Sequence, residues 1–296
     1  MTQTRATGLA LAALSAILFS GKAIVVKLMY RHNVDPATVI ALRMGMAAPV
    51  FAIIAWWQAQ RGAALSGRDC GIIALLGFLG YYLSSLLDFW GLQYVSAALE
   101  RLILFLTPTL VLLISAAALK RAITRRQWLA MIVSYVGIAL VFVENLRWGG
   151  NEVFFGSALV FGAALSYSLY LIVSGEIVQR IGSTRLVAYV MCVACVLSLA
   201  HYALVHPLGD LLTHNRSVLG LSAINAVFCT ILPVFLTMYA IARIGAPSAS
   251  QLSVLGPISL LFLGAAILGE PITGLQLLGT AVVLMGVMLV STSRRA

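Results

Sequence analysis

Two similar stretches decide the interpretation of this chain: GEPITGLQLLG at residues 269–279 and KRAITRRQWLA at residues 120–130. They share Ile, Thr, Gln and Leu at the same spacing, 149 residues apart. The earlier stretch is rich in Lys and Arg, whereas the later stretch contains neither. The similarity indicates a duplicated unit, and the difference in charge indicates that the two copies lie in different surroundings.

The composition places most of the chain in a lipid bilayer. Hydrophobic residues make up 61% of the sequence and charged residues only 9%, with a mean hydropathy of +1.03. Soluble domains carry about 25% charged residues. The net charge of +10 lies in short gaps between apolar runs, which is typical of membrane loops rather than of a nucleic-acid-binding face. We therefore expect a lipid environment and no nucleic-acid partner.

Apolar runs of the length that crosses a bilayer recur along the whole sequence. A spanning helix needs about 20 apolar residues. Windows of this size predict ten spans, which lie at 8–30, 36–58, 71–92, 95–118, 127–143, 155–175, 185–205, 218–241, 246–268 and 272–291.

The basic residues predict the orientation of these spans. With a cytoplasmic N-terminus, twelve of the 19 Lys and Arg residues fall in inner segments, and three, Arg31, Arg147 and Arg216, fall in outer loops. Cytoplasmic loops carry an excess of Lys and Arg. Both termini are therefore predicted to be cytoplasmic.

The duplication extends over more than the two quoted stretches. Residues 106–141 match residues 255–290 at 14 of 36 positions without a gap. A weaker echo relates 8–22 to 156–170. The most informative pairs are Pro108 with Pro257, Thr124 with Thr273, Gln127 with Gln276, Gly137 with Gly286, Phe19 with Tyr167, and Lys22 with Tyr170.

Each copy contains five predicted spans. Because five is an odd number, the second copy has the opposite orientation in the membrane. Residues 120–126 then lie inside, where positive charge is favoured, and residues 269–275 lie outside. The predicted fold is an all-α integral membrane protein of ten helices in two inverted five-helix repeats, 8–143 and 155–291. Inverted repeats of this kind are an architecture of secondary transporters.

The second copy also carries a motif that resembles a known family. Pro257 is followed by Leu268-Gly269-Glu270-Pro271-Ile272-Thr273, then by Gln276 and Gly279. This pattern resembles the EamA-type drug/metabolite transporters, although Lys120-Arg121-Ala122 replaces Gly-Glu-Pro in the first copy. By overall similarity the chain looks most like the bacterial aromatic amino-acid exporters. The resemblance implies a central cavity between the halves, a cell inner (plasma) membrane location, no ATP-hydrolysing module and no cofactor.

Charged residues within the spans are candidate site residues, because burial of charge in a membrane is costly. Lys22 lies deepest, and it is expected either to meet a substrate carboxylate or to pair with Asp88 or Glu100. The other charges are expected to pair among themselves near the outer surface or to snorkel to it. This second group comprises Lys27, Arg43, Asp88, Glu100 and Arg101.

Aromatic residues form a second set of candidates. A stripe at Phe78, Tyr82, Ser85 and Phe89 follows one face of an α-helix, and Trp90 corresponds to Tyr239 in the other copy. Buried tyrosine hydroxyls need polar partners. The candidates for substrate binding are Tyr82, Trp90, Tyr167, Tyr170 and Tyr239, with packing or contact with lipid as the alternative role.

Two further features bear on binding and motion. Gln251 lies in a polar cluster with Ser248, Ser250 and Ser253, which is expected either to bind a ligand or to pack helices. Pro108 and Pro257 occupy matched positions, as hinges for relative motion of the halves or as static kinks.

The predicted function is export of amino acids by alternating access and without ATP hydrolysis. The resemblance implies a preference for aromatic amino acids. The alternatives are export of other small metabolites or drugs, and antiport of a phosphorylated substrate. An enzyme is disfavoured, because the sequence has no H-E-x-x-H, G-x-S-x-G or paired deep carboxylates. A passive sensor or scaffold is also less favoured, because inverted symmetry has no obvious use in such a protein. The oligomeric state is left open.

Overall fold

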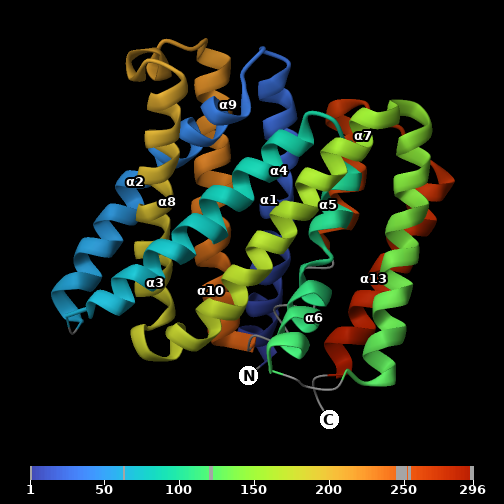
Figure 1. Cartoon of the computed structure of the whole chain (residues 1–296), viewed down its shortest axis with the longest axis horizontal. Helices are drawn as coiled ribbons and strands as arrows, with labels where there is room; N and C mark the ends of the chain where they lie inside the picture. Colours follow the sequence, from blue (N-terminus) through green and yellow to red (C-terminus); the bar gives the residue numbers. More distant parts are fainter. Residues whose placement is uncertain (1, 63, 120–122, 245–251, 253–254, 294–296) are drawn as a thin grey trace.

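The computed structural model describes residues 2–62, 64–119, 123–244, 252 and 255–293, which form helices joined by short connections (Figure 1). The elements are α1 (Thr2–Tyr30), α2 (Pro36–Arg61), α3 (Gly67–Gly77), η1 (Phe78–Leu83), α4 (Ser84–Leu92), α5 (Ala97–Leu104), α6 (Thr107–Leu119), α7 (Arg125–Ile181), α8 (Ser183–Val205), η2 (Leu208–Leu212), α9 (Arg216–Ala226), η3 (Val227–Ile231), α10 (Leu232–Ile244), α12 (Leu255–Leu263), η4 (Gly264–Leu268) and α13 (Gly274–Ser293).

The described part of the chain contains eight helices that are long and apolar enough to cross a membrane. Two shorter apolar helices, Leu255–Leu268 and Gly274–Leu289, lie where the last two predicted spans were expected. Large apolar side chains remain exposed on the outside of the bundle, such as Leu204, Ile53 and Trp56. Such a surface is stable only against lipid, so the prediction of an all-helical, multi-pass membrane protein is confirmed.

The element α7 consists of two helices that run in opposite directions (Figure 1). The reversal occurs at Gly150, where φ is 55° and ψ is −139°. Only glycine adopts this conformation readily, because it lacks a Cβ. Gly150 therefore allows the fifth and sixth predicted spans to follow each other with almost no loop.

Matched local features recur at the separation found in the sequence. The π-helical segments η1 and η3 begin at Phe78 and Val227, which are 149 residues apart. In α7, the side chain of Thr124 accepts from the backbone N–H of Gln127 in a capping box. Thr273 accepts from the backbone N–H of Gln276 at the start of α13 in the same way. The shared Thr is thus a helix-capping residue in both copies, whereas the Gln completes a capping box in the first copy, and Oε1 of Gln276 has no hydrogen-bond partner among the described residues.

The packing of helices follows the same relation. Helix α1 packs against η3 and α10, and the second half of α7 packs against η1 and α4. These two contacts are equivalent if the chain is two copies of one unit. Helix α2 packs against α8, and the first half of α7 packs against α13. In both cases an element of one repeat packs against the matching element of the other repeat.

Matched glycines allow the first half of α7 and α13 to approach closely. A Cβ on Gly137 would lie 2.7 Å from the carbonyl oxygen of Gly279, and one on Gly286 would lie 2.7 Å from the carbonyl oxygen of Ala130. Ala130 and Gly279 are themselves 149 residues apart. Small residues at such crossings let helix backbones pack tightly in membranes, which explains why glycine occupies both positions.

Replacement of Gly137 by Ala is expected to destabilise the fold by about 1–3 kcal/mol, because the added methyl group must push two backbones apart. Thermal unfolding in detergent micelles measures this loss. Gly71→Ala is the matched control, since a Cβ there meets nothing within 4 Å. Equal melting temperatures for the two variants would contradict the proposed close approach.

Candidate functional site

Five charged side chains gather inside the bundle where α1, α2, α4 and α5 meet. Lys22, Arg43, Asp88 and Glu100 are buried, and Arg101 is partly buried. The cluster holds three cations and two carboxylates, so its formal charge is +1 if all five are ionised. Charges at such depth in a membrane protein usually mark a functional site.

Lys22 is paired with the acids of this cluster. Its ammonium group forms an ion pair with Asp88, and its Nζ lies 3.8 Å from Oε1 of Glu100. The same Nζ lies 5.7 Å from the ring centre of Phe19 and 5.4 Å from that of Phe89. Of the two roles expected for Lys22, pairing with the acids is the one that this structure contains.

The two arginines have no carboxylate partner among the described residues. Arg43 donates from Nη2 to the hydroxyl of Ser85 at 2.7 Å, and its guanidinium stacks over Phe89 at 4.8 Å. Arg101 lies 5.4 Å from the ring centre of Phe19. Within the described residues, Nε of neither arginine has a hydrogen-bond acceptor. Both guanidinium groups therefore have donors available for an anion.

Three tyrosines lie beside the charged cluster. Tyr167 and Tyr170 stack with ring centres 5.3 Å apart, and Tyr81 contacts them edge-on at 6.5 and 5.4 Å. Tyr167 and Tyr170 are the repeat counterparts of Phe19 and Lys22. The structure thus brings two of the predicted tyrosines toward the cluster from the second half of the chain.

Tyr82 points elsewhere because a π-helical segment changes the phase of its helix. The predicted stripe assumed α-helical spacing from Phe78 onward, whereas Phe78–Leu83 form η1. A π turn inserts one residue into the helix. Tyr82 consequently packs against Phe78 and His201, at 5.7 and 5.9 Å between ring centres. Tyr81, which the sequence analysis did not single out, contacts the tyrosine pair instead.

Trp90 and Tyr239 lie on the outside of the bundle. Trp90 is 43% exposed and contacts Phe155 edge-on, and Tyr239 is 59% exposed beside Arg243. Among the described residues, neither forms a hydrogen bond, ion pair or ring contact with the charged cluster. Their surroundings agree with packing or lipid contact, the alternative given for the aromatic residues.

The remaining candidates are Gln251 and the two prolines. Gln251 and the neighbouring Ser248, Ser250 and Ser253 fall outside the described residues. Pro257 lies in α12, which begins directly after the undescribed residues 253–254, and Pro108 is the second residue of α6, after the turn that separates α5 from α6. Proline is tolerated in the first turn of a helix because the missing N–H has no partner there. The hinge role of these prolines stays a prediction.

The Gly-Glu-Pro motif joins three parts of the chain. Gly269 ends η4 with a positive φ of 74°. Both carboxylate oxygens of Glu270 accept from the backbone N–H of Ala97 at the start of α5, at 3.0 and 3.2 Å. Oε1 of Glu270 also lies 3.2 Å from Nζ of Lys27. Lys27 therefore pairs with the second half of the chain, and not with the other charges of the first half.

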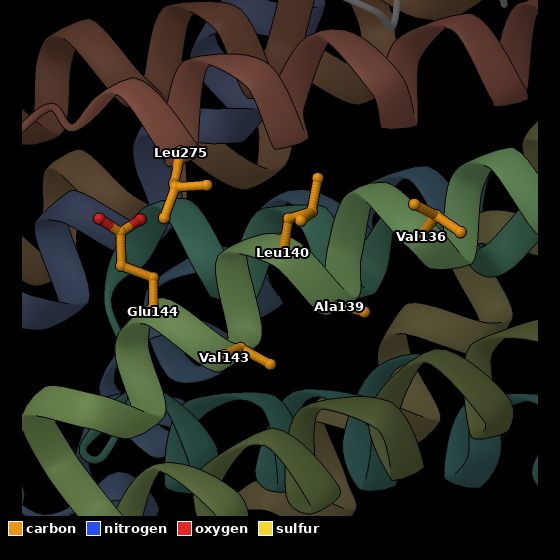
Figure 2. Close-up of a pocket in the computed structure, with 6 residues that line it drawn as sticks. All are labelled: Val136, Ala139, Leu140, Val143, Glu144 and Leu275. Carbon is orange, nitrogen blue, oxygen red and sulfur yellow. The ribbon is translucent and has the colours of Figure 1, made fainter.

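Two surface pockets lie away from the charged cluster. One, of about 360 Å³, is lined by five apolar residues and Glu144, with Glu144 and Leu275 at one end and Val136 at the other (Figure 2). The second, of about 450 Å³, adjoins it along the first half of α7. Both are almost wholly apolar and are lined by exposed side chains, such as Val143 in the first pocket and Trp128 in the second, so we assign them to the lipid-facing surface.

An apolar helical bundle with charges and tyrosines in its interior defines an integral membrane protein that handles polar solutes. The comparisons with known proteins agree with this class. The model of the EamA-like transporter family matches residues 6–143 and 154–292. The chain belongs to this family.

Individual relatives support the assignment. The "Uncharacterized transporter YcbK" of Bacillus subtilis (strain 168) is 30% identical over 277 residues, which cover 90% of this chain and 86% of the relative. The "Uncharacterized transporter YyaM" of the same organism is 25% identical, with coverage of 87% and 85%. A solved structure described as "Crystal structure of protein" has the same fold, with a TM-score of 0.65, 15% identity and coverage of 98% and 99%.

Substitution of Lys22 by Met is expected to lower the free energy of unfolding by about 3–5 kcal/mol, because it leaves the buried carboxylate of Asp88 without its cation. Denaturant titration in mixed micelles measures the change. Arg180→Met is the matched control: Arg180 pairs with Asp69, but its side chain is 61% exposed. An exposed pair is worth at most about 1 kcal/mol, so equal losses in both variants would overturn the structural role of Lys22.

Proposed function

We propose that this transporter exports amino acids, with a preference for aromatic ones, across the cell inner (plasma) membrane by alternating access and without ATP hydrolysis. The observation that carries the proposal is the buried charged cluster flanked by aromatic rings from both halves of the chain. An amino acid offers a carboxylate, an ammonium group and a side chain, and the cluster has a matching group for each.

Arg101 is the proposed partner of the substrate carboxylate. Lys22 is already paired with acids, whereas Arg101 has no carboxylate partner among the described residues. Arg101 lies over Phe19, which is 39% exposed, and near Tyr167. A carboxylate bound at this guanidinium would place an aromatic side chain against these two rings. Few polar groups in a mainly apolar site are typical of small-molecule recognition.

Alternating access would require contacts between the halves to break and form. At the predicted outer end, Lys27 and the start of α5 are tied to Glu270, and Arg31 donates to the carbonyl oxygen of Leu268 at 2.9 Å. These ties join the first half to the second. We propose that they hold the outer end closed and separate when the site opens outward.

A phosphorylated substrate is the second candidate, because three cations occupy the cluster. Lys22 is paired with Asp88, and the two arginines lie against different rings, Arg43 over Phe89 and Arg101 over Phe19. A phosphate would need at least two free cations at one place. The available donors of Arg101 therefore favour a carboxylate with a single negative charge.

Proteoliposomes loaded with unlabelled phenylalanine are expected to take up labelled phenylalanine by exchange. Leucine or tyrosine should compete more strongly than a sugar phosphate or a cationic drug. Arg101→Met should lower the exchange rate at least about tenfold, since a lost charge-assisted hydrogen bond is worth roughly 1.5–3 kcal/mol. Uptake of label is followed with time after dilution.

Tyr239→Phe is the matched control, because Tyr239 lies on the exposed surface of the bundle. It should retain the parent rate, and size-exclusion chromatography should show that both variants remain folded. Inhibition by a sugar phosphate but not by amino acids would discard the proposed substrate and retain the transporter. Exchange that survives unchanged in Arg101→Met would discard the proposed carboxylate site.

The proposed orientation, with both termini cytoplasmic, has a natural probe. Cys70 is exposed at the start of α3, whereas Cys195 and Cys229 are buried. Positive charge at Arg61 and Arg68 predicts that this end of α3 faces the cytoplasm. A membrane-impermeant maleimide should therefore label inside-out vesicles and not intact cells, and Cys70→Ser should remove the labelling. Labelling of Cys70 in intact cells would reverse the orientation.

A further inference from the structure

Glu100 is a fully buried carboxyl group without a hydrogen-bond donor among the described residues. It is 0% exposed, and neither of its oxygens has a hydrogen-bond partner in the part of the chain that the structure describes. Lys22 lies 3.8 Å from it but forms its closer pair with Asp88. An ionised carboxylate in an apolar interior without hydrogen bonds is very costly, and such a group is neutralised by a proton instead.

Asp88 offers the natural acceptor for that proton. Oδ2 of Asp88 binds Lys22, whereas Oδ1 has no donor among the described residues. The two carboxyl groups share one ammonium group, because Nζ of Lys22 pairs with Asp88 and lies 3.8 Å from Oε1 of Glu100. A proton on Glu100 donated to Asp88 would satisfy one oxygen of each residue. Without that proton, two carboxylates would face each other in an apolar interior and share a single ammonium group.

The surrounding cations allow the proton on Glu100 to be released. They lie on several elements around the carboxyl pair, so they partly stabilise the negative charge that forms when the proton leaves. The charged and titratable groups that face the pair are Lys22 on α1, Tyr30 at the end of α1, Arg43 on α2 and Arg101 on α5, with Tyr167 on α7 beside Arg101. Helices α12 and α13 contain no Asp, Glu, Lys, Arg or His.

We propose that Glu100 is the proton-coupling residue of this transporter, protonated in the substrate-free state and discharged when the ammonium group of a substrate takes the place of its proton. This inference rests on the proposed function only for the identity of the substrate. One positive charge replaces another at the carboxyl group of Glu100, while the substrate carboxylate is balanced by Arg101. Export of the amino acid would then be coupled to entry of a proton.

A proton and a substrate ammonium group compete for the carboxyl group of Glu100, so only one of them is bound at a time. Each therefore crosses the membrane in a separate step, and the two move in opposite directions. This produces antiport, since the site carries a proton on the return path of the substrate. A site that bound both together would instead move them in the same direction.

Infrared spectroscopy of the purified, substrate-free protein tests the proton directly. At neutral pH the parent is expected to show the C=O stretching band of a protonated, buried carboxylic acid, which shifts in D₂O. Glu100→Gln should lack this band. Glu152→Gln is the matched control, because Glu152 is exposed, and it should retain the band. If Glu100→Gln does not fold, Glu100→Asp should shift the band. A band that survives unchanged in the Glu100 variants, or is absent from the parent, overturns the proposal.

Transport tests the coupling. Vesicles with an acidic lumen, held at zero membrane potential, should accumulate labelled phenylalanine about tenfold for each unit of pH difference, because one pH unit is a tenfold ratio of proton activity. Glu100→Gln should lose this accumulation, and any exchange that it retains should be independent of pH. Accumulation that persists in this variant would overturn the coupling role.

The two measurements separate this proposal from the proposed function. A parent that exchanges no amino acid, but loses its carboxylic band in Glu100→Gln, would retain the proton site and discard the amino-acid substrate. Exchange of amino acids with a band that is insensitive to Glu100 would retain the substrate and discard the proton site.

Discussion

The pairing of Lys22 with Asp88 is the constraint on which the interior of this protein depends. An ammonium group inside an apolar bundle is stable only when opposite charge and hydrogen bonds compensate the loss of water. Lys22 belongs to α1 and Asp88 to α4, so the pair determines how the first and third spans face each other. The positions of Glu100 and of the arginines follow, since each lies against one member of this pair or against the rings of Phe19 and Phe89.

The two halves share a backbone arrangement but contribute different side chains to the interior. The π-helical segments, capping residues and close glycine contacts recur at a constant separation. The charged residues of the cluster all come from the first half, and Tyr170 occupies the place that Lys22 has in the repeat. A duplicated scaffold preserves what the backbone requires, such as a small residue at a crossing. Its side chains are free to differ where the backbone sets no such requirement.

Sequence patterns identified the membrane helices and the residues at helix starts. They did not identify residues whose direction depends on the rotation of a helix. Hydropathy and charge located the membrane helices, and the repeated Thr and Gln marked helix starts. Tyr167 and Tyr170 were found because the repeat paired them with Phe19 and Lys22. Tyr81 was missed because the π-helical segment Phe78–Leu83 rotates the rest of the helix, and the sequence patterns that we used do not predict such a segment.

The sequence by itself determined that this chain is a helical membrane protein with a duplicated plan, because the bilayer demands long apolar segments and the repeat preserves its capping and crossing residues. Only the tertiary structure decided which buried charges are paired. Lys22, Lys27 and Arg101 are all cations within spans, yet Lys22 meets Asp88, Lys27 meets Glu270 of the other half, and Arg101 meets an aromatic ring. Partner choice depends on distances between helices far apart in the chain, and these arise only when the helices pack.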